Sequence, residues 1–240
     1  MRIRLLLPVL SFLLLALWGC RERALESYYF PLDEFQDGTI YEFRGAKDER
    51  DPPFYWHYRT VEEDGTTFLK GMYYDHNLLL YQSMKEEKVA NGMLLVDHFL
   101  YEYDSTGVLV QVPAEIEGGN VFVFGAPDPG QVLFSKTRFS YPSDPNTINT
   151  LIRNRQFQKD TTYTYGGKKY DAVIFYVREL IDIQDEGHTE HEFDGVEIYA
   201  KGLGLVYFRK NIGEGFITEY KLENRYSEEA FEERMGVRLR

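Results

Sequence analysis

Short runs in which apolar and polar residues alternate recur along most of this chain, and they constrain its fold more than any other feature. In FYWHYRTV, the rings of Phe54, Trp56 and Tyr58 would share one face of a strand. His57 and Arg59 would then share the opposite face. Roughly ten or more such runs follow one another without the long helical patterns of a βα protein. The chain is therefore predicted to be all-β and mainly antiparallel.

Turn signals separate these runs where an antiparallel sheet needs hairpins. Asn91-Gly92 and Gly166-Gly167 each stand between two strand-like runs, and Asn-Gly is the strongest short hairpin signal. After the second turn, an apolar face is interrupted by one charged residue, Glu179. The apolar members of that face are Val173, Phe175, Val177, Ile181 and Ile183. We find no fixed-period repeat, which argues against a propeller or solenoid.

Two segments carry helix signals instead. Asp144-Pro145 combines a capping residue with a proline of the first turn, and it predicts a helix there. The apolar stripe of that helix would be Ile148, Leu151 and Ile152. Near the other end, Ser227 is a capping residue and Gly236 a stop signal, with Phe231 and Met235 spaced to dock on a sheet. The predicted architecture is one large twisted sheet or half-barrel with a short C-terminal helix.

The N-terminal residues have the layout of a secretory signal. Two arginines precede an apolar run from Leu5 to Trp18, which is shorter than the ~20 residues that a membrane-spanning helix needs. Leu17-Trp18-Gly19-Cys20 resembles the bacterial lipobox, although Trp18 is bulkier than the pattern prefers. The resemblance implies cleavage after Gly19 and acylation of Cys20. Cys20 is the only cysteine, so it has no partner for an internal disulfide.

These signals divide the chain into three parts. They are a lipoprotein signal peptide over residues 1–19, a lipidated tether over residues 20–27, and a single β-rich domain over residues 28–240. Two or more acyl chains anchor a protein stably, so the predicted location is the bacterial cell envelope with a lipid anchor in the membrane. Arg21 and Glu22 follow the cysteine without an acidic run, and their resemblance to known sorting patterns favours the outer membrane, facing the periplasm.

The composition narrows the set of partners. The formal net charge is −12, and loss of Arg2 and Arg4 with the signal makes it −14. An acidic surface without Lys/Arg clusters repels nucleic acid and anionic headgroups, so no nucleic-acid partner is expected. Aromatic residues make up 16% of the chain, with 19 Tyr and 17 Phe. They are typical of a β core with tyrosines at its margins, and the alternative is a sugar- or lipid-binding face.

The segment DEGHTEHE is the one candidate for a metal site, with His188, Glu190 and His191 as weak ligand candidates. In a strand, His188 and Glu190 would face one way and His191 the other, so the segment is predicted to be a solvated hairpin. No metal and no cofactor are predicted.

No catalytic residue is predicted either. The chain lacks a G-x-S-x-G nucleophile elbow, and its single cysteine is assigned to lipid attachment. Three further histidines lie in separate strand-like runs and are predicted to be surface or hydrogen-bonded residues, not bases. They are His57, His76 and His98.

Two stretches resemble motifs of uncharacterised bacterial envelope lipoproteins. Tyr29-Phe30-Pro31-Leu32 with the segment from Gly38 to Phe43 is similar to their "FPL…G…W-x-Y" start, although Ile40 or Tyr41 stands in place of tryptophan. Tyr199 to Val206, which contains KGLGLV, is similar to their "A-x-G-x-G-L-V" close. The resemblance implies a curved antiparallel sheet, in some members a half-barrel like that of lipoprotein carriers.

The predicted function is a non-catalytic, membrane-anchored extracytoplasmic lipoprotein. It would bind a protein partner or an apolar ligand in the cell envelope, in a groove lined mainly by aromatic and aliphatic side chains. The sequence assigns no ligand-binding residue. The alternative is an envelope polysaccharide hydrolase that uses paired carboxylates. A concavity without convergent titratable groups would favour binding, and two carboxylates in a cleft, one with a raised pKa, would favour hydrolysis.

Overall fold

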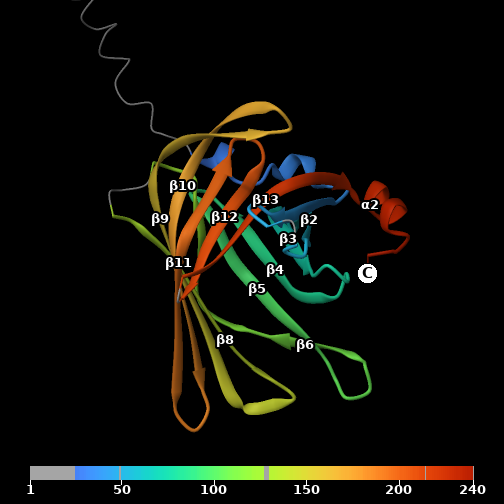
Figure 1. The fold of residues 1–240 in the computed structure, drawn as a ribbon, viewed down its shortest axis with the longest axis vertical. Helices are drawn as coiled ribbons and strands as arrows, with labels where there is room; N and C mark the ends of the chain where they lie inside the picture. The colour runs from blue at the N-terminus through green and yellow to red at the C-terminus, as the bar shows by residue number, and fades with distance from the viewer. Residues whose placement is uncertain (1–24, 49, 127–129, 214, 240) are drawn as a thin grey trace, which may run out of the picture.

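The structure is a computed structural model that describes residues 25–48, 50–126, 130–213 and 215–239 (Figure 1). The predictions for the signal peptide, for cleavage at Gly19 and for acylation of Cys20 lie outside these residues. The described strands are β1 Thr39–Gly45, β2 Phe54–Glu63, β3 Thr66–Tyr74, β4 Leu80–Val89, β5 Gly92–Tyr103, β6 Leu109–Pro113, β7 Glu115–Val123, β8 Val132–Tyr141, β9 Asp144–Tyr165, β10 Lys168–Gln184, β11 His188–Ala200, β12 Gly204–Gly213 and β13 Phe216–Ser227. The helices are the short 3-10 turns η1 Glu26–Tyr28 and η2 Leu32–Glu34 and the α-helix α2 Glu228–Met235.

The sheet closes on itself. Its strand order is β4-β3-β2-β1-β13-β12-β11-β10-β9-β8-β7-β5-β6, and an added pairing of β4 with β5 joins the two ends. The result is a closed antiparallel barrel of 12 strands, with β6 paired to the second half of β5. The predicted all-β antiparallel class with a short C-terminal helix is confirmed. The sheet also curls further than the predicted half-barrel, because closure leaves no unpaired edge between β4 and β5.

The helix predicted from Asp144-Pro145 is wrong. Residues 144–165 form strand β9, which pairs with β8 over residues 144–156 and with β10 over residues 148–165. A proline is tolerated near the start of a strand, and two ladders of backbone hydrogen bonds outweigh a local capping signal. The predicted stripe of Ile148, Leu151 and Ile152 does not form one face of this strand, since Leu151 lines the cavity together with Arg153 and Arg155 and side chains at even and odd positions alternate between faces.

The predicted hairpins are present. Gly166 and Gly167 connect β9 to β10 with backbone φ angles of +56° and +76°. Both values lie in the left-handed region, where a type I′ hairpin turn places its two central residues and where glycine carries no steric penalty. The turn therefore sets the register in which Lys168 pairs with Tyr165.

Residues 25–35 close one end of the barrel, and we call this segment the plug. In Figure 1 it is the blue segment with two short helices, placed across the end at which β9 and β10 meet. Leu25 and Phe35 are fully buried, and Tyr29 and Phe30 join the same core. The Leu25 amide donates to the Phe124 carbonyl at 2.7 Å. Leu25, which falls within the predicted tether over residues 20–27, is thus buried in the barrel core.

Helix α2 covers the outside of the barrel. The Ser227 hydroxyl accepts a hydrogen bond from the Ala230 amide at 3.3 Å, and Gly236 ends the helix with a φ angle of +67°. Phe231 is buried against Ile40, Tyr55 and Tyr74 on the outer face of β1 to β3. The predicted cap, stop and docking residue of this helix are confirmed.

The described residues contain the whole closed barrel, its plug and its core. A form that begins at residue 21 retains all of them. Within the described part of the chain, the structure holds no helix that is both long and apolar enough to traverse a bilayer.

Candidate functional site in the barrel interior

A cavity of about 570 Å³ lies inside the barrel. Its floor is formed by Tyr29 and Phe30 of the plug, and its sides extend past Leu151 and Ile181 toward the opposite end. Its lining includes an aromatic wall, a charged wall and a neutral polar wall, and aliphatic side chains such as Leu151, Val177 and Ile181 make up much of the rest.

The aromatic wall comes from β2, β3, β12 and β13. Its members are Phe54, Trp56, Tyr58, Tyr73, Phe208 and Tyr220. The Trp56 ring stacks on Tyr58 at a centroid distance of 5.6 Å and meets Tyr73 edge-on at 5.5 Å. Phe54, Trp56 and Tyr58 all face the barrel interior, as their alternation in the sequence predicts. This wall offers flat apolar surface to a ring-shaped or apolar group.

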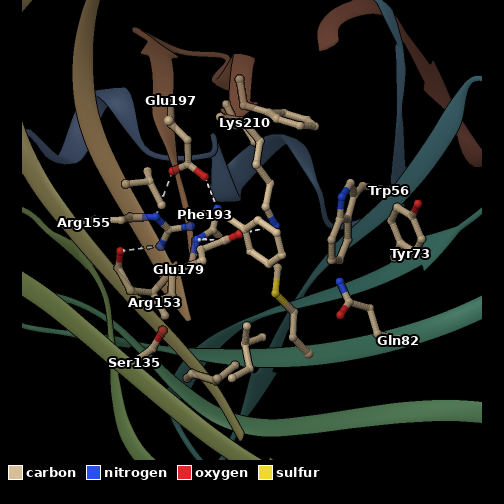
Figure 2. Close-up of a pocket in the computed structure, with 18 of the residues that line it drawn as sticks. Trp56, Tyr73, Gln82, Ser135, Arg153, Arg155, Glu179, Phe193, Glu197 and Lys210 are labelled. Carbon is tan, nitrogen blue, oxygen red and sulfur yellow. Dashed lines mark hydrogen bonds and ion pairs between the residues drawn. The ribbon is translucent and has the colours of Figure 1, made fainter. Parts of the chain in front are cut away.

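The charged wall lies across the cavity, on β9 to β12 (Figure 2). Its members are Arg153, Arg155, Glu179, Glu197 and Lys210. The Arg155 Nε atom donates to Glu197 at 2.8 Å, and Arg155 also donates to the Val121 carbonyl at 3.0 Å. Arg153 forms a short contact with Glu197 and lies 3.0 Å from Glu179, which in turn forms a short ion pair with Lys210. The pairs form because the strand register places Arg153 opposite Glu179.

Both carboxylates of the charged wall are held ionised. Burial opposes ionisation of Glu197, but Arg153 and Arg155 outweigh it and keep the pKa of Glu197 below its usual range. Burial likewise opposes ionisation of Glu179, and Arg153 with Lys210 keeps its pKa low. The wall thus contains three cations and two carboxylates, and elsewhere in the lining Arg209 adds a fourth cation while Asp194 and Glu86 add two carboxyl groups.

The neutral polar wall joins β4, β5 and β8 and consists of Gln82, His98, Ser135 and Thr137. His98 is 8% exposed and Thr137 is 3% exposed. Among the described residues, neither the Thr137 hydroxyl nor the His98 Nδ1 atom has a hydrogen-bond partner. A buried polar group without a partner carries a desolvation cost of about 1–3 kcal/mol, so native proteins rarely leave one without a reason. The other ring nitrogen, His98 Nε2, lies 3.5 Å from the Gln82 Oε1 atom, which agrees with the prediction of a hydrogen-bonded histidine.

Burial lowers the pKa of His98 to about 4. Since the unfolded imidazole titrates near 6.5, the unfolded chain binds the extra proton between these two values. The contribution of His98 to the free energy of unfolding is therefore present above pH 6.5 and is lost as the pH falls toward 4.

We expect acidification from pH 7 to pH 5 to remove about 2 kcal/mol of stability through His98. A His98→Gln variant keeps a neutral polar group, and its loss of stability over the same interval should be smaller by that amount. Urea unfolding at both pH values measures the difference. Equal losses in the two proteins would contradict the assignment of His98 as a buried neutral imidazole.

Glu86 is the one carboxyl group of the cavity whose pKa is raised. Burial is the cause, and it outweighs the opposing effects of the Tyr29 hydroxyl and of Arg155 and Arg153. The Tyr29 hydroxyl lies in a short hydrogen bond to Glu86. Glu86 therefore also fixes the plug to the barrel wall.

The other residues considered in the sequence lie elsewhere. His188 is at the end of the β10–β11 hairpin, 3.2 Å from Asp182, while Glu190 and His191 are exposed on β11. Within the described residues, no group of three or more His, Cys, Asp or Glu side chains is arranged to hold a metal ion. His57 is buried on the outside of the barrel, 3.0 Å from Glu228 of α2.

Glu179 is the site residue that the sequence marked most clearly, because it interrupts an apolar face. Its partners come from β9, β11 and β12, so no local pattern could identify them. The alternation of Arg153 and Arg155 on β9 was hidden by the mistaken helix. Nothing in the sequence marked Thr137 as a site residue. It stands out only because its buried hydroxyl has no hydrogen-bond partner among the described residues of the folded structure.

Comparison with known proteins supports the fold. No family model and no curated protein matches the chain. A structure from Parabacteroides distasonis ATCC 8503, provisionally described as a lipoprotein, is similar with a TM-score of 0.51 and 13% identity over 82% of this chain and 97% of that chain. A structure from Bacteroides fragilis NCTC 9343, provisionally described as an exported protein with a YmcC-like fold, has the same TM-score and identity over 82% and 98% of the two chains. At this identity the similarity concerns the fold alone.

Proposed function

We propose that this protein is a non-catalytic lipoprotein of the bacterial cell envelope that binds a small ligand inside its barrel. The observation that carries the proposal is the cavity, because its lining combines the unpartnered Thr137 hydroxyl and His98 Nδ1 atom with an aromatic wall. A ligand that accepts from the Thr137 hydroxyl or pairs with His98 would remove the desolvation cost of these groups. Concave sites with apolar walls and a few convergent polar groups are typical ligand sites.

The anchor is the second part of the proposal. The lipobox-like Leu17 to Cys20 stretch supports attachment through Cys20, and the two similar structures, described as a lipoprotein and an exported protein, are consistent with an envelope location. The plug begins five residues after Cys20, so the closed end of the barrel would lie next to the membrane. Ligand would then reach the cavity from the end that faces away from the membrane.

A hydrolase remains the second candidate because of one observation. Glu86, with a raised pKa, and Glu197, with a lowered pKa, line the same cavity, which is the pattern of a general acid and a carboxylate partner. Two contacts argue against it. Tyr29 is hydrogen-bonded to Glu86, and arginines engage both oxygens of Glu197, so neither carboxyl group is free for substrate. Polysaccharide turnover that is abolished by Glu86→Gln would establish the hydrolase instead.

The binding proposal is tested with the anionic fluorescent dye 1-anilinonaphthalene-8-sulfonate and a form of the protein that begins at residue 21. We expect saturable binding with one dye per chain. A Ser135→Phe variant places a ring in the cavity and should weaken binding by at least about tenfold, which corresponds to about 1.4 kcal/mol. Dye binding without saturation, or equal binding to the Ser135→Phe variant, would contradict a site in the barrel interior.

A further inference from the structure

The three walls of the cavity differ in what they offer a ligand, and this difference limits the class of molecule that fits. A long acyl chain needs a continuous apolar lining, because methylene groups cannot replace the hydrogen bonds of polar groups that they cover. Here the charged wall and the neutral polar wall interrupt the aromatic and aliphatic parts of the lining. An acyl chain would therefore desolvate Thr137 and His98 without pairing them.

The cations of the charged wall differ in how exposed they are and in how many of their N–H donors are already bonded. The Arg155 side chain is only 10% exposed and is held by Glu197 and by the Val121 carbonyl. The side chains of Arg153 and Lys210 are 32% and 33% exposed. A guanidinium group has five N–H donors and an ammonium group has three, so both retain donors beyond their bonds to Glu179 and Glu197.

The cations of the charged wall lie opposite stacked rings. Figure 2 shows Arg153, Arg155 and Glu197 on one side of the view and Trp56 with Tyr73 on the other, with Lys210 between them. The chain has a formal net charge of −12, but the cavity lining gathers four cations, Arg153, Arg155, Arg209 and Lys210, against the carboxylates Glu179, Asp194 and Glu197 and the buried Glu86, whose pKa is raised. Such a site favours an anion, and the reduced dielectric of the interior strengthens the attraction.

We infer that the ligand is a compact organic anion with a ring-shaped body. Its ring lies on Trp56 and Tyr73, its carboxylate, phosphate or sulfonate group binds Lys210 and Arg153, and its remaining polar atoms pair with Thr137 and His98. This inference rests on the proposed function, because it names the ligand class of the same cavity. Charge-assisted hydrogen bonds from a guanidinium and an ammonium group supply the preference for an anion.

The test compares two dyes that share one ring system. N-phenyl-1-naphthylamine is the neutral counterpart of 1-anilinonaphthalene-8-sulfonate and lacks only the sulfonate. We expect the anionic dye to bind at least about tenfold more tightly, and a Lys210→Gln variant to lose about tenfold in affinity for the anionic dye alone. Lys210→Arg should retain the preference. The control is Lys159→Gln, since Lys159 is an exposed cation on β9 and its removal should leave both affinities unchanged.

Each outcome separates the ligand class from the binding function. Equal affinities for the two dyes would overturn the anion while the binding site stands. Binding of neither dye would overturn both. An equal effect of Lys159→Gln would show that net charge alone sets the preference, and this also overturns the inference. If Lys210→Gln does not fold, added salt replaces it as the probe, because it should weaken binding of the anionic dye and leave the neutral dye unaffected.

Discussion

Replacing Arg155 with methionine should destabilise the barrel by about 3–5 kcal/mol, the cost of breaking a buried ion pair. Glu197, whose side chain is 4% exposed, would lose its 2.8 Å partner, and the Val121 carbonyl would lose its donor. Arg153 alone would then neutralise a carboxylate that two arginines hold in the native protein. The midpoint of urea unfolding at constant slope measures the loss.

The matched double variant removes both partners. Arg155→Met combined with Glu197→Leu replaces the pair with apolar groups of similar volume, and a buried ion pair replaced in this way is often neutral in stability or better. We therefore expect the double variant to recover most of the loss. A double variant less stable than Arg155→Met would contradict the view that the unpaired Glu197 carboxylate causes the damage.

Truncating Phe30 to alanine should cost about 3–5 kcal/mol, because the plug would lose its central ring. Phe30 is 8% exposed and lies 4.4 Å from the Tyr58 ring and 5.8 Å from the Tyr41 ring, measured between centroids. Its ring also packs over Gly204, whose φ angle of +76° and missing side chain make room for it. The cavity left by the truncation cannot collapse easily, since barrel strands on several sides are fixed by their pairing.

Phe216→Ala is the control for this prediction. Phe216 is 67% exposed at the start of β13, so its truncation should change the free energy of unfolding by less than about 0.5 kcal/mol. Chemical denaturation of both variants gives the comparison. Equal effects at the two positions would show that the plug is not part of the barrel core.

The fold class could be predicted from the sequence because its signals are local. Alternation placed the rings of Phe54 and Trp56 inside the barrel and His57 outside, and the Gly166-Gly167 turn joined two strands. Closure of the barrel is different, since it depends on the pairing of β4 with β5 and on the summed twist of all strands. No short segment of the sequence determines the summed twist of all strands, so the sequence was equally consistent with an open half-barrel.

The candidate site could be predicted only in part for a similar reason. Alternation identified the aromatic wall, and aromatic and aliphatic side chains do make up most of the cavity lining as expected, but the charged wall was not predicted. Arg153, Glu179 and Glu197 come from three neighbouring strands, and register alone brings them together. The mistaken helix from Asp144 hid one of these strands. Sequence patterns therefore describe the faces of single strands, and the chemistry of the cavity arises where several faces meet.

The position of a bound anion tests the central claim most directly. A crystal of the protein soaked with a bromine-bearing naphthalene sulfonate would show the bromine by anomalous diffraction. We expect one peak inside the barrel, close to Lys210 and between Trp56 with Tyr73 on one side and Arg153 on the other. Peaks confined to the outer surface, for example at the exposed Phe216, would contradict a ligand site in the barrel interior.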